Sequence, residues 1–195
     1  MLNKKLNKYN IILGSSSPRR KQLLRGLNIL FSIKKTNKKE EYPLNFKKTK
    51  IAEFLAKQKA KFISKIKTNN NYLLITADTI VIQNKEILHK PKDKNDAIKT
   101  LKQLSGKKHK VISGVCIKTN QQEVVFSSVT EVYFNDLSQD EIIHYIDRFK
   151  PFDKAGSYGI QEWIGYIGIK KIKGCYNNVI GLPTSELYEK LQLFT

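Results

Sequence analysis

Four serine and arginine residues near the N-terminus have the chemistry of a phosphate-binding loop. Ser15, Ser17, Arg19 and Arg20 follow the apolar run at residues 9–13 directly. Ser17 can cap a helix that begins with a proline, and a helix N-terminus presents backbone N–H groups and a favourable dipole to an anion. Arginine adds planar, bidentate donors for phosphate oxygens. A capped helix with surface arginines explains the loop equally well, and the Walker A sequence is absent.

A single carboxylate stands within the most β-prone part of the chain. Asp78 separates the apolar runs at residues 72–76 and 79–82. A buried carboxylate requires a cation, a metal ion or a shifted pKa. We interpret Asp78 as a metal ligand or as a general base that activates water, with a structural cap of a nearby turn as the alternative. Glu40 and Glu41 could add ligands for a metal ion, although a glutamate pair in a loop is commonly solvated.

Other candidate groups cannot be separated from their surroundings by residue type alone. Lys59 and Lys90 resemble the many other lysines of the chain. Residues 151–168 are rich in glycine and aromatic residues around Gln161, which suits a loop that approaches a ligand closely. A plain glycine-rich turn is an equally good explanation of that segment.

The elements that must position these residues alternate between strands and helices. The serine-rich loop is expected to connect a buried strand to a helix capped by Ser17, and Ser138 with Glu141 predicts a capping box. The turn at residues 119–122 predicts a long antiparallel hairpin. We expect strands at residues 9–13, 31–35, 72–76, 79–82, 110–118, 123–133 and 167–172, and helices at 18–26, 50–67, 93–104, 138–149 and near 187–194.

Length and composition favour one cytoplasmic domain. A chain of 195 residues can bury a substantial core, and we expect a single domain over residues 1–195. Cys116 and Cys175 stand alone, without metal-ligand or disulfide spacing, which favours a reducing compartment. We expect neither a signal peptide nor a membrane span, because the apolar runs are too short.

The formal charge of +19 does not by itself predict a nucleic-acid partner. Lysine greatly outnumbers arginine and accompanies abundant Asn and Ile, a combination that an AT-rich genome explains. The lysines are also spread along the chain instead of forming a stripe with interleaved aromatics. Nucleic-acid binding is therefore disfavoured, whereas attraction of a small polyphosphate substrate is expected.

Seven motifs together resemble the Maf family of nucleotide pyrophosphatases, and the resemblance covers about residues 11–191. Gly14 stands where the family usually has Ala, and Lys150 stands where an acid is frequent. The motifs are LGSSSPRR at 13–20, LAKQKA at 55–60, ADTIV at 77–81, KP at 90–91, LSGKKHKV at 104–111, DKAGSYGIQ at 153–161 and NVIGLP at 178–183.

The resemblance implies roles for the chemical groups. Asp78 would accept a proton from the water that attacks the α-phosphorus. Glu40 would help Asp78 to hold a divalent cation, Mg²⁺ or Mn²⁺, and Glu41 is the less favoured alignment for that position. Lys59 and Lys90 would join Arg19 in neutralising the triphosphate.

The resemblance also implies a substrate class and a fold. Arg19, Thr79 and Gln161 match positions at which the family selects its substrate. The segment ending at Gln161 is similar to the dTTP/UTP branch, which includes modified pyrimidine triphosphates among its expected substrates. The implied fold is an ITPase-like α/β structure of two lobes, with a long mixed sheet, flanking helices, a cleft between the lobes and a possible homodimer. The alternative function is a non-enzymatic, nucleotide- or nucleic-acid-binding regulator of cell division.

Overall fold

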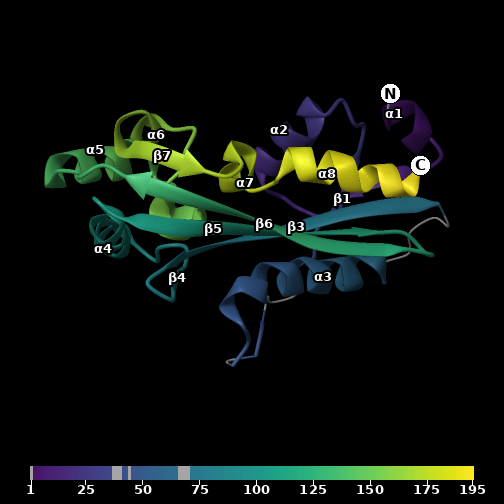
Figure 1. Cartoon of the computed structure of the whole chain (residues 1–195), viewed down its shortest axis with the longest axis horizontal. Helices are drawn as coiled ribbons and strands as arrows, with labels where there is room; N and C mark the ends of the chain where they lie inside the picture. The colour runs from purple at the N-terminus through teal and green to yellow at the C-terminus, as the bar shows by residue number, and fades with distance from the viewer. Residues whose placement is uncertain (1, 37–40, 44, 66–70) are drawn as a thin grey trace. The chain divides into compact units, whose positions relative to one another are not determined.

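The computed structural model describes residues 2–36, 41–43, 45–65 and 71–195, apart from the side chain of Asn3. Within them the strands form one mixed seven-stranded sheet in the order β2-β1-β3-β5-β6-β7, with β4 paired to β3. The predicted α/β class and the mixed sheet are confirmed (Figure 1). The strands are β1 Asn10–Leu13, β2 Ser32–Ile33, β3 Tyr72–Gln83, β4 Glu86–Leu88, β5 Lys108–Lys118, β6 Glu123–Phe134 and β7 Ile169–Lys173.

Tertiary contacts divide the chain into two compact units. The first unit contains Met1–Asp78, Ser113–Ser128 and Gly181–Thr195, and the second contains Thr79–Ile112 and Val129–Ile180. Helices of the first unit are α1 Leu2–Leu6, α2 Pro18–Gly26, η1 Lys48–Lys50, α3 Ile51–Ser64, α8 Thr184–Leu191 and η4 Gln192–Phe194. Those of the second unit are α4 Lys94–Leu104, α5 Gln139–Phe149, η2 Pro151–Asp153, η3 Ala155–Ser157, α6 Trp163–Gly168 and α7 Tyr176–Ile180.

Alternate residues of β3 fill two separate cores in the first unit. Leu73 and Ile75 pack into the core formed with α1, α2 and α8, whereas Tyr72 and Leu74 pack against α3. Figure 1 shows α3 along one face of these strands and α2 and α8 along the other. Because successive side chains of a strand point to opposite faces, an apolar run such as residues 72–75 is what a strand covered on both sides needs.

Helix α3 packs unusually close to the sheet. A Cβ atom at Gly114 of β5 would lie 2.2 Å from the carbonyl carbon of Ala52, so only glycine leaves room for the helix backbone. Ala56 and Ala60 continue the same small-residue stripe and are fully buried. The Thr76 hydroxyl of β3 donates a 2.7 Å hydrogen bond to the Ala56 carbonyl. These contacts fix the position of α3 along β3.

The second unit has one apolar core between its strands and its helices. Leu101 and Leu104 of α4 pack there with Tyr145 and Ile146 of α5, and Val132 contributes from β6. The predicted capping box of Ser138 and Glu141 is present at the start of α5.

The prediction from sequence misses several short elements and one strand continuation. The strand β3 runs unbroken through Ala77 and Asp78, where an interruption is predicted. Helices α1, α6 and α7 and strand β4 are not predicted, because elements of three to six residues carry too few positions to show a period. The β5–β6 hairpin and helices α2, α3, α4, α5 and α8 are confirmed.

Both cysteines are free thiols, as predicted. Cys116 is fully buried, and burial raises the pKa of its thiol to about 12, which keeps it protonated and unreactive. In the described part of the chain, no helix is both long and apolar enough to cross a membrane.

Replacement of Gly114 tests the close packing of α3. Gly114→Ala should lower the free energy of unfolding by about 1–3 kcal/mol, because the new methyl group would meet helix backbone instead of a movable side chain. Gly26→Ala is the matched control, since nothing lies within 4 Å of its added Cβ. Urea denaturation of the variants and the parent protein measures both effects. An unchanged denaturation midpoint for Gly114→Ala would show that the helix is free to move away.

Candidate active site

The loop after β1 begins at Gly14, which is tightly packed by neighbouring side chains. The Gly14 N–H continues the parallel ladder by donating to the Ile75 carbonyl at 2.7 Å. A Cβ at Gly14 would lie 2.5 Å from Thr76 Cγ2 and 2.7 Å from Ile63 Cδ1. An alanine at position 14 would therefore overlap those two side chains unless they moved, which favours the glycine.

The serine and arginine residues of this loop form one hydrogen-bonded group. Ser17 caps α2 and accepts from the Arg20 N–H at 3.4 Å, while its own N–H donates to Ser15 Oγ at 3.2 Å. Arg20 donates through Nη1 to Ser15 Oγ at 3.4 Å and through Nε to the Gly181 carbonyl at 2.9 Å. Arg20 therefore ties the loop to the segment before α8. Arg19 lies partly buried in the first turn of α2.

Lys59 and Asp78 form a close ion pair. Lys59 Nζ lies 2.6 Å from Asp78 Oδ1 and donates to the Ala77 carbonyl at 3.4 Å. Their side chains are only 12% and 13% exposed, so water screens the pair weakly. The predicted need of Asp78 for a cation is confirmed, and the cation is Lys59 of α3. Burial of two charges rarely increases stability over an apolar pair, which favours a chemical reason for keeping them.

The loop and the ion pair lie at the same level along the neighbouring strands β1 and β3. Strands β1 and β3 are parallel neighbours, with Leu13 opposite Ile75. Ser15 follows Leu13 by two residues, and Asp78 follows Ile75 by three. The hydroxyls and helix N-terminus after β1 therefore lie beside Asp78 at the carboxyl end of β1, where β3 continues past the end of its neighbour. Ligands of open α/β sheets bind outside the carboxyl ends of strands.

The metal ligands predicted from sequence are only partly described. Glu40 lies outside the described residues. Glu41 has an exposed side chain, and its main-chain carbonyl accepts from Gln58 Nε2 at 3.0 Å, one residue before Lys59 in α3. Among the described residues, no group of three His, Cys, Asp or Glu could hold a metal ion. One carboxylate such as Asp78, with phosphate oxygens of a bound nucleotide, is nevertheless a ligand set that suits Mg²⁺.

The remaining predicted residues belong to the second unit. Thr79 is partly buried in β3, and Lys90 is exposed after β4. The Gly156 N–H donates to the carbonyl of His89 at 3.4 Å, so the loop that leads to Gln161 contacts the segment that carries Lys90. Gln161 Oε1 is buried and has no hydrogen-bond partner among the described residues. Such an acceptor costs free energy until a donor meets it.

The loop at residues 153–162 contains functional candidates that the sequence does not reveal. Lys154 is 8% exposed and pairs with Asp153 and Glu162, and Glu162 also accepts from Tyr145 of α5. Lys154 belongs to a recognised motif, but no sequence spacing identifies its partners. Ser157 has a left-handed backbone with φ of 62°, which is uncommon for a serine.

His109 has a structural role. Its Nε2 lies 2.7 Å from the Tyr158 hydroxyl, and its ring packs edge-on against Phe134. Burial lowers the pKa of His109 to about 4, so the imidazole is neutral near pH 7. A neutral, buried histidine with aromatic neighbours does not suggest a catalytic acid.

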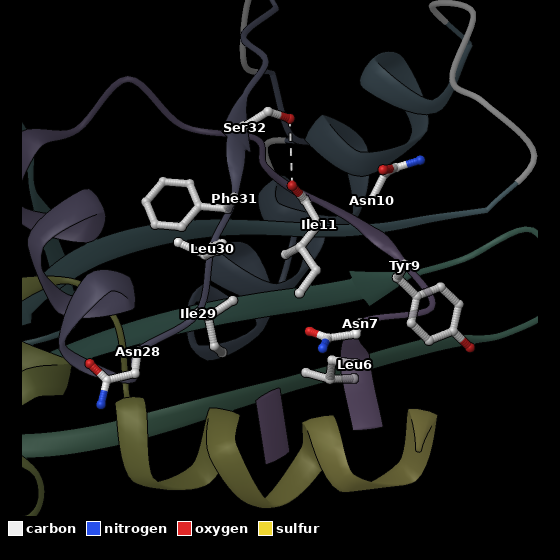
Figure 2. Close-up of a pocket in the computed structure, with 10 residues that line it drawn as sticks. All are labelled: Leu6, Asn7, Tyr9, Asn10, Ile11, Asn28, Ile29, Leu30, Phe31 and Ser32. Atoms are coloured by element: carbon white, nitrogen blue, oxygen red, sulfur yellow. Dashed lines mark hydrogen bonds between the residues drawn. The ribbon is translucent and has the colours of Figure 1, made fainter. Parts of the chain in front are cut away.

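A separate pocket lies beside β1 and β2 in the first unit (Figure 2). It has a volume of about 590 Å³ and contains none of the residues predicted to do chemistry. Its lining combines apolar side chains with asparagine amides: Leu6, Asn7, Tyr9, Asn10, Ile11, Asn28, Ile29, Leu30, Phe31 and Ser32.

Comparison with known proteins places the chain in a family. Residues 10–194 match the Maf-like protein family. A dTTP/UTP pyrophosphatase of Flavobacterium johnsoniae is 46% identical over 192 residues, which cover 98% of each chain. A dTTP/UTP pyrophosphatase of Porphyromonas gingivalis is 48% identical over 191 residues, with 97% of this chain and 96% of the relative covered. A dTTP/UTP pyrophosphatase of Bacteroides fragilis is 45% identical over 188 residues, with 96% of this chain and 97% of the relative covered. The chain belongs to the Maf family.

Proposed function

We propose that this protein is a nucleoside triphosphate pyrophosphatase that hydrolyses dTTP and UTP to the monophosphate and pyrophosphate. The observation that carries the proposal is the Lys59–Asp78 pair beside the serine-rich loop, at the carboxyl end of β1. Relatives of 45–48% identity, named dTTP/UTP pyrophosphatase, support the substrate class. Modified pyrimidine triphosphates belong to the same proposed class, and we place the enzyme in the cytoplasm as a possible homodimer.

In the proposed reaction, water attacks the α-phosphorus and transfers a proton to the carboxylate of Asp78. The new bond joins the water oxygen to the α-phosphorus, and the bond to the bridging oxygen breaks as pyrophosphate leaves. Triphosphate oxygens offer Lys59 a new partner, which would release Asp78 Oδ1 for the proton. Arg19 and the N-terminus of α2 stabilise the negative charge that develops.

A divalent cation, Mg²⁺ or Mn²⁺, completes the proposed site. Asp78 would hold it together with phosphate oxygens, and the resemblance adds Glu40 as a second ligand. When bound, the cation neutralises charge on the phosphates and polarises the phosphorus centre.

The second unit carries the residues proposed for nucleotide selection. The amide of Gln161 can donate to O4 and accept from N3–H of uracil or thymine. Its buried, unpartnered Oε1 supports that role, because a base N–H would supply the missing donor. Thr79 is proposed to contribute to selection with Arg19, and Lys90 to bind phosphate.

Product analysis tests the reaction class. Purified protein with UTP and Mg²⁺ should release UMP and pyrophosphate, and EDTA should abolish turnover because the metal ion is part of the proposed site. Anion-exchange chromatography of the early products measures both. Orthophosphate as the first product, or full activity in EDTA, would contradict the proposal. Complete absence of hydrolysis across a panel of triphosphates would favour the non-enzymatic, nucleotide- or nucleic-acid-binding regulator.

Removal of the carboxylate tests the proton acceptor. Asp78→Asn should lower kcat by roughly 10²–10⁴-fold while the protein stays folded, because an amide has the same size but is not basic. Asp147→Asn is the matched control, since Asp147 pairs with Lys94 at 2.6 Å on the exposed surface. Steady-state kinetics and thermal unfolding are measured on the same preparations. A folded Asp78→Asn variant with wild-type kcat would eliminate Asp78 as the base.

Truncation of Gln161 tests base selection. Gln161→Ala should reduce the preference for UTP over CTP by about 1–3 kcal/mol, because CTP differs at the edge that the amide would contact. Gln139→Ala is the control, since Gln139 is exposed and its side chain accepts a hydrogen bond from Lys102 at 2.9 Å, outside the loop at residues 153–162. The ratio of kcat/KM values for the two nucleotides is the measurement. Equal losses for both nucleotides would refute a base-specific role.

A further inference from the structure

A buried polar network joins the two ends of the loop at residues 153–162. Lys154 Nζ lies 3.0 Å from Glu162 Oε1 and 2.8 Å from Asp153 Oδ1. The Lys154 side chain is 9% exposed, whereas that of Asp153 is 54% exposed. Glu162 is therefore the partner that meets the lysine in the interior.

Tyr145 connects this ion pair to the middle of the loop. Its hydroxyl donates to Glu162 Oε2 and accepts from the Gly159 N–H at 3.0 Å. The residue is fully buried on α5, and its ring stacks on Phe149 with centroids 5.3 Å apart. Because Tyr145 belongs to a helix with a complete capping box, it gives the loop a rigid anchor.

We propose that Tyr145, Glu162 and Lys154 form a positioning clamp that sets nucleotide selectivity by fixing Gln161. The inference rests on the proposed function, in which Gln161 reads the base. Two clamp points, Gly159 and Glu162, enclose Gln161 in the sequence, so its backbone is held on both sides. The clamp residues do not contact the base in this proposal and act through Gln161.

The physical basis of the clamp is the small tolerance of hydrogen-bond recognition. An error of about 1 Å in the position of a recognition group can cost roughly 10²-fold in rate. A free loop of ten residues could not hold an amide within that limit. The clamp contacts restrict the backbone of a glycine-rich segment that would otherwise have many accessible conformations.

Backbone strain within the loop supports the same conclusion. Ser157 has φ of 62° and a fully buried hydroxyl without a hydrogen-bond partner in the described part of the chain. Strained conformations of this kind persist only where the surrounding structure determines them strongly. The clamp and the hydrogen bond from Gly156 to His89 hold the backbone on either side of Ser157 in this conformation.

Two substitutions disturb the clamp in independent ways. Tyr145→Phe keeps the buried ring but removes the hydroxyl from Glu162 and from the Gly159 N–H. Gly159→Ala would place a Cβ 2.7 Å from Glu162 Cδ and so displace the carboxylate without changing any charge. Tyr133→Phe is the matched control, since that hydroxyl donates to Glu131 in the same unit and outside the loop.

The decisive measurement is the UTP-to-CTP ratio of kcat/KM in full-length protein. Tyr145→Phe and Gly159→Ala should each lower the ratio by about tenfold or more, with a raised KM for UTP and kcat within about threefold of wild type. Tyr133→Phe should keep the wild-type ratio. In a Gln161→Ala background, Tyr145→Phe should have no further effect on the ratio, because the clamp acts through Gln161.

Hydrogen exchange of the nucleotide-free protein provides a readout independent of catalysis. Tyr145→Phe should accelerate exchange in residues 153–162, and Tyr133→Phe should not. Unchanged selectivity in both clamp variants, or a full additional loss in the Gln161→Ala background, would overturn the clamp. If the wild-type enzyme prefers UTP over CTP and the variants give either of these results, the clamp is refuted and the proposed function is not. A wild-type protein without any preference for UTP over CTP refutes the proposed function and the clamp together.

Discussion

The contact between α3 and the strands beneath it determines the chemistry of the first unit. Glycine at position 114 lets the helix backbone touch β5, and the Thr76 hydroxyl fixes the helix against β3. Three residues after Ala56, Lys59 then lies opposite Asp78 at 2.6 Å. A helix held farther away by larger side chains could not bring a lysine ammonium group to this carboxylate. The ion pair is therefore a consequence of close packing.

This dependence explains why a charged residue is compatible with the interior of β3. A buried carboxylate alone would be costly, but Lys59 supplies a charge-assisted hydrogen bond, and the strand continues through Asp78 without a break. Under the proposed function, the pair would be exchanged for contacts with a polyphosphate, which an apolar pair of equal volume could not make. A site that must open toward an anionic substrate thus benefits from an interaction that contributes little to stability.

The sequence predicts those features that depend on local periodicity and capping. The Ser17 cap of α2, the capping box of α5 and the β5–β6 hairpin follow from neighbouring residues alone. The partner of Asp78 could not be predicted from the residues themselves, because Lys59 is one of many lysines and pairs across 19 positions of the chain. The Tyr145–Glu162 contact could not be predicted for the same reason, since it joins a helix to a loop residue 17 positions later in the sequence. Only the family resemblance selected Lys59, and nothing in the sequence selected Tyr145.

The two units hold their candidate residues by different physical means. The first relies on helix–strand packing around small residues, and the second relies on a buried polar network around an otherwise glycine-rich loop. The boundary between the units falls between Asp78 and Thr79, two consecutive residues of β3. The proposed base and the proposed selectivity residue next to it therefore belong to separately packed structures. If the proposed roles hold, changes in the polar network should alter recognition without disturbing the packing that pairs Lys59 with Asp78. Nucleotide selectivity and proton transfer would then be separable by mutation.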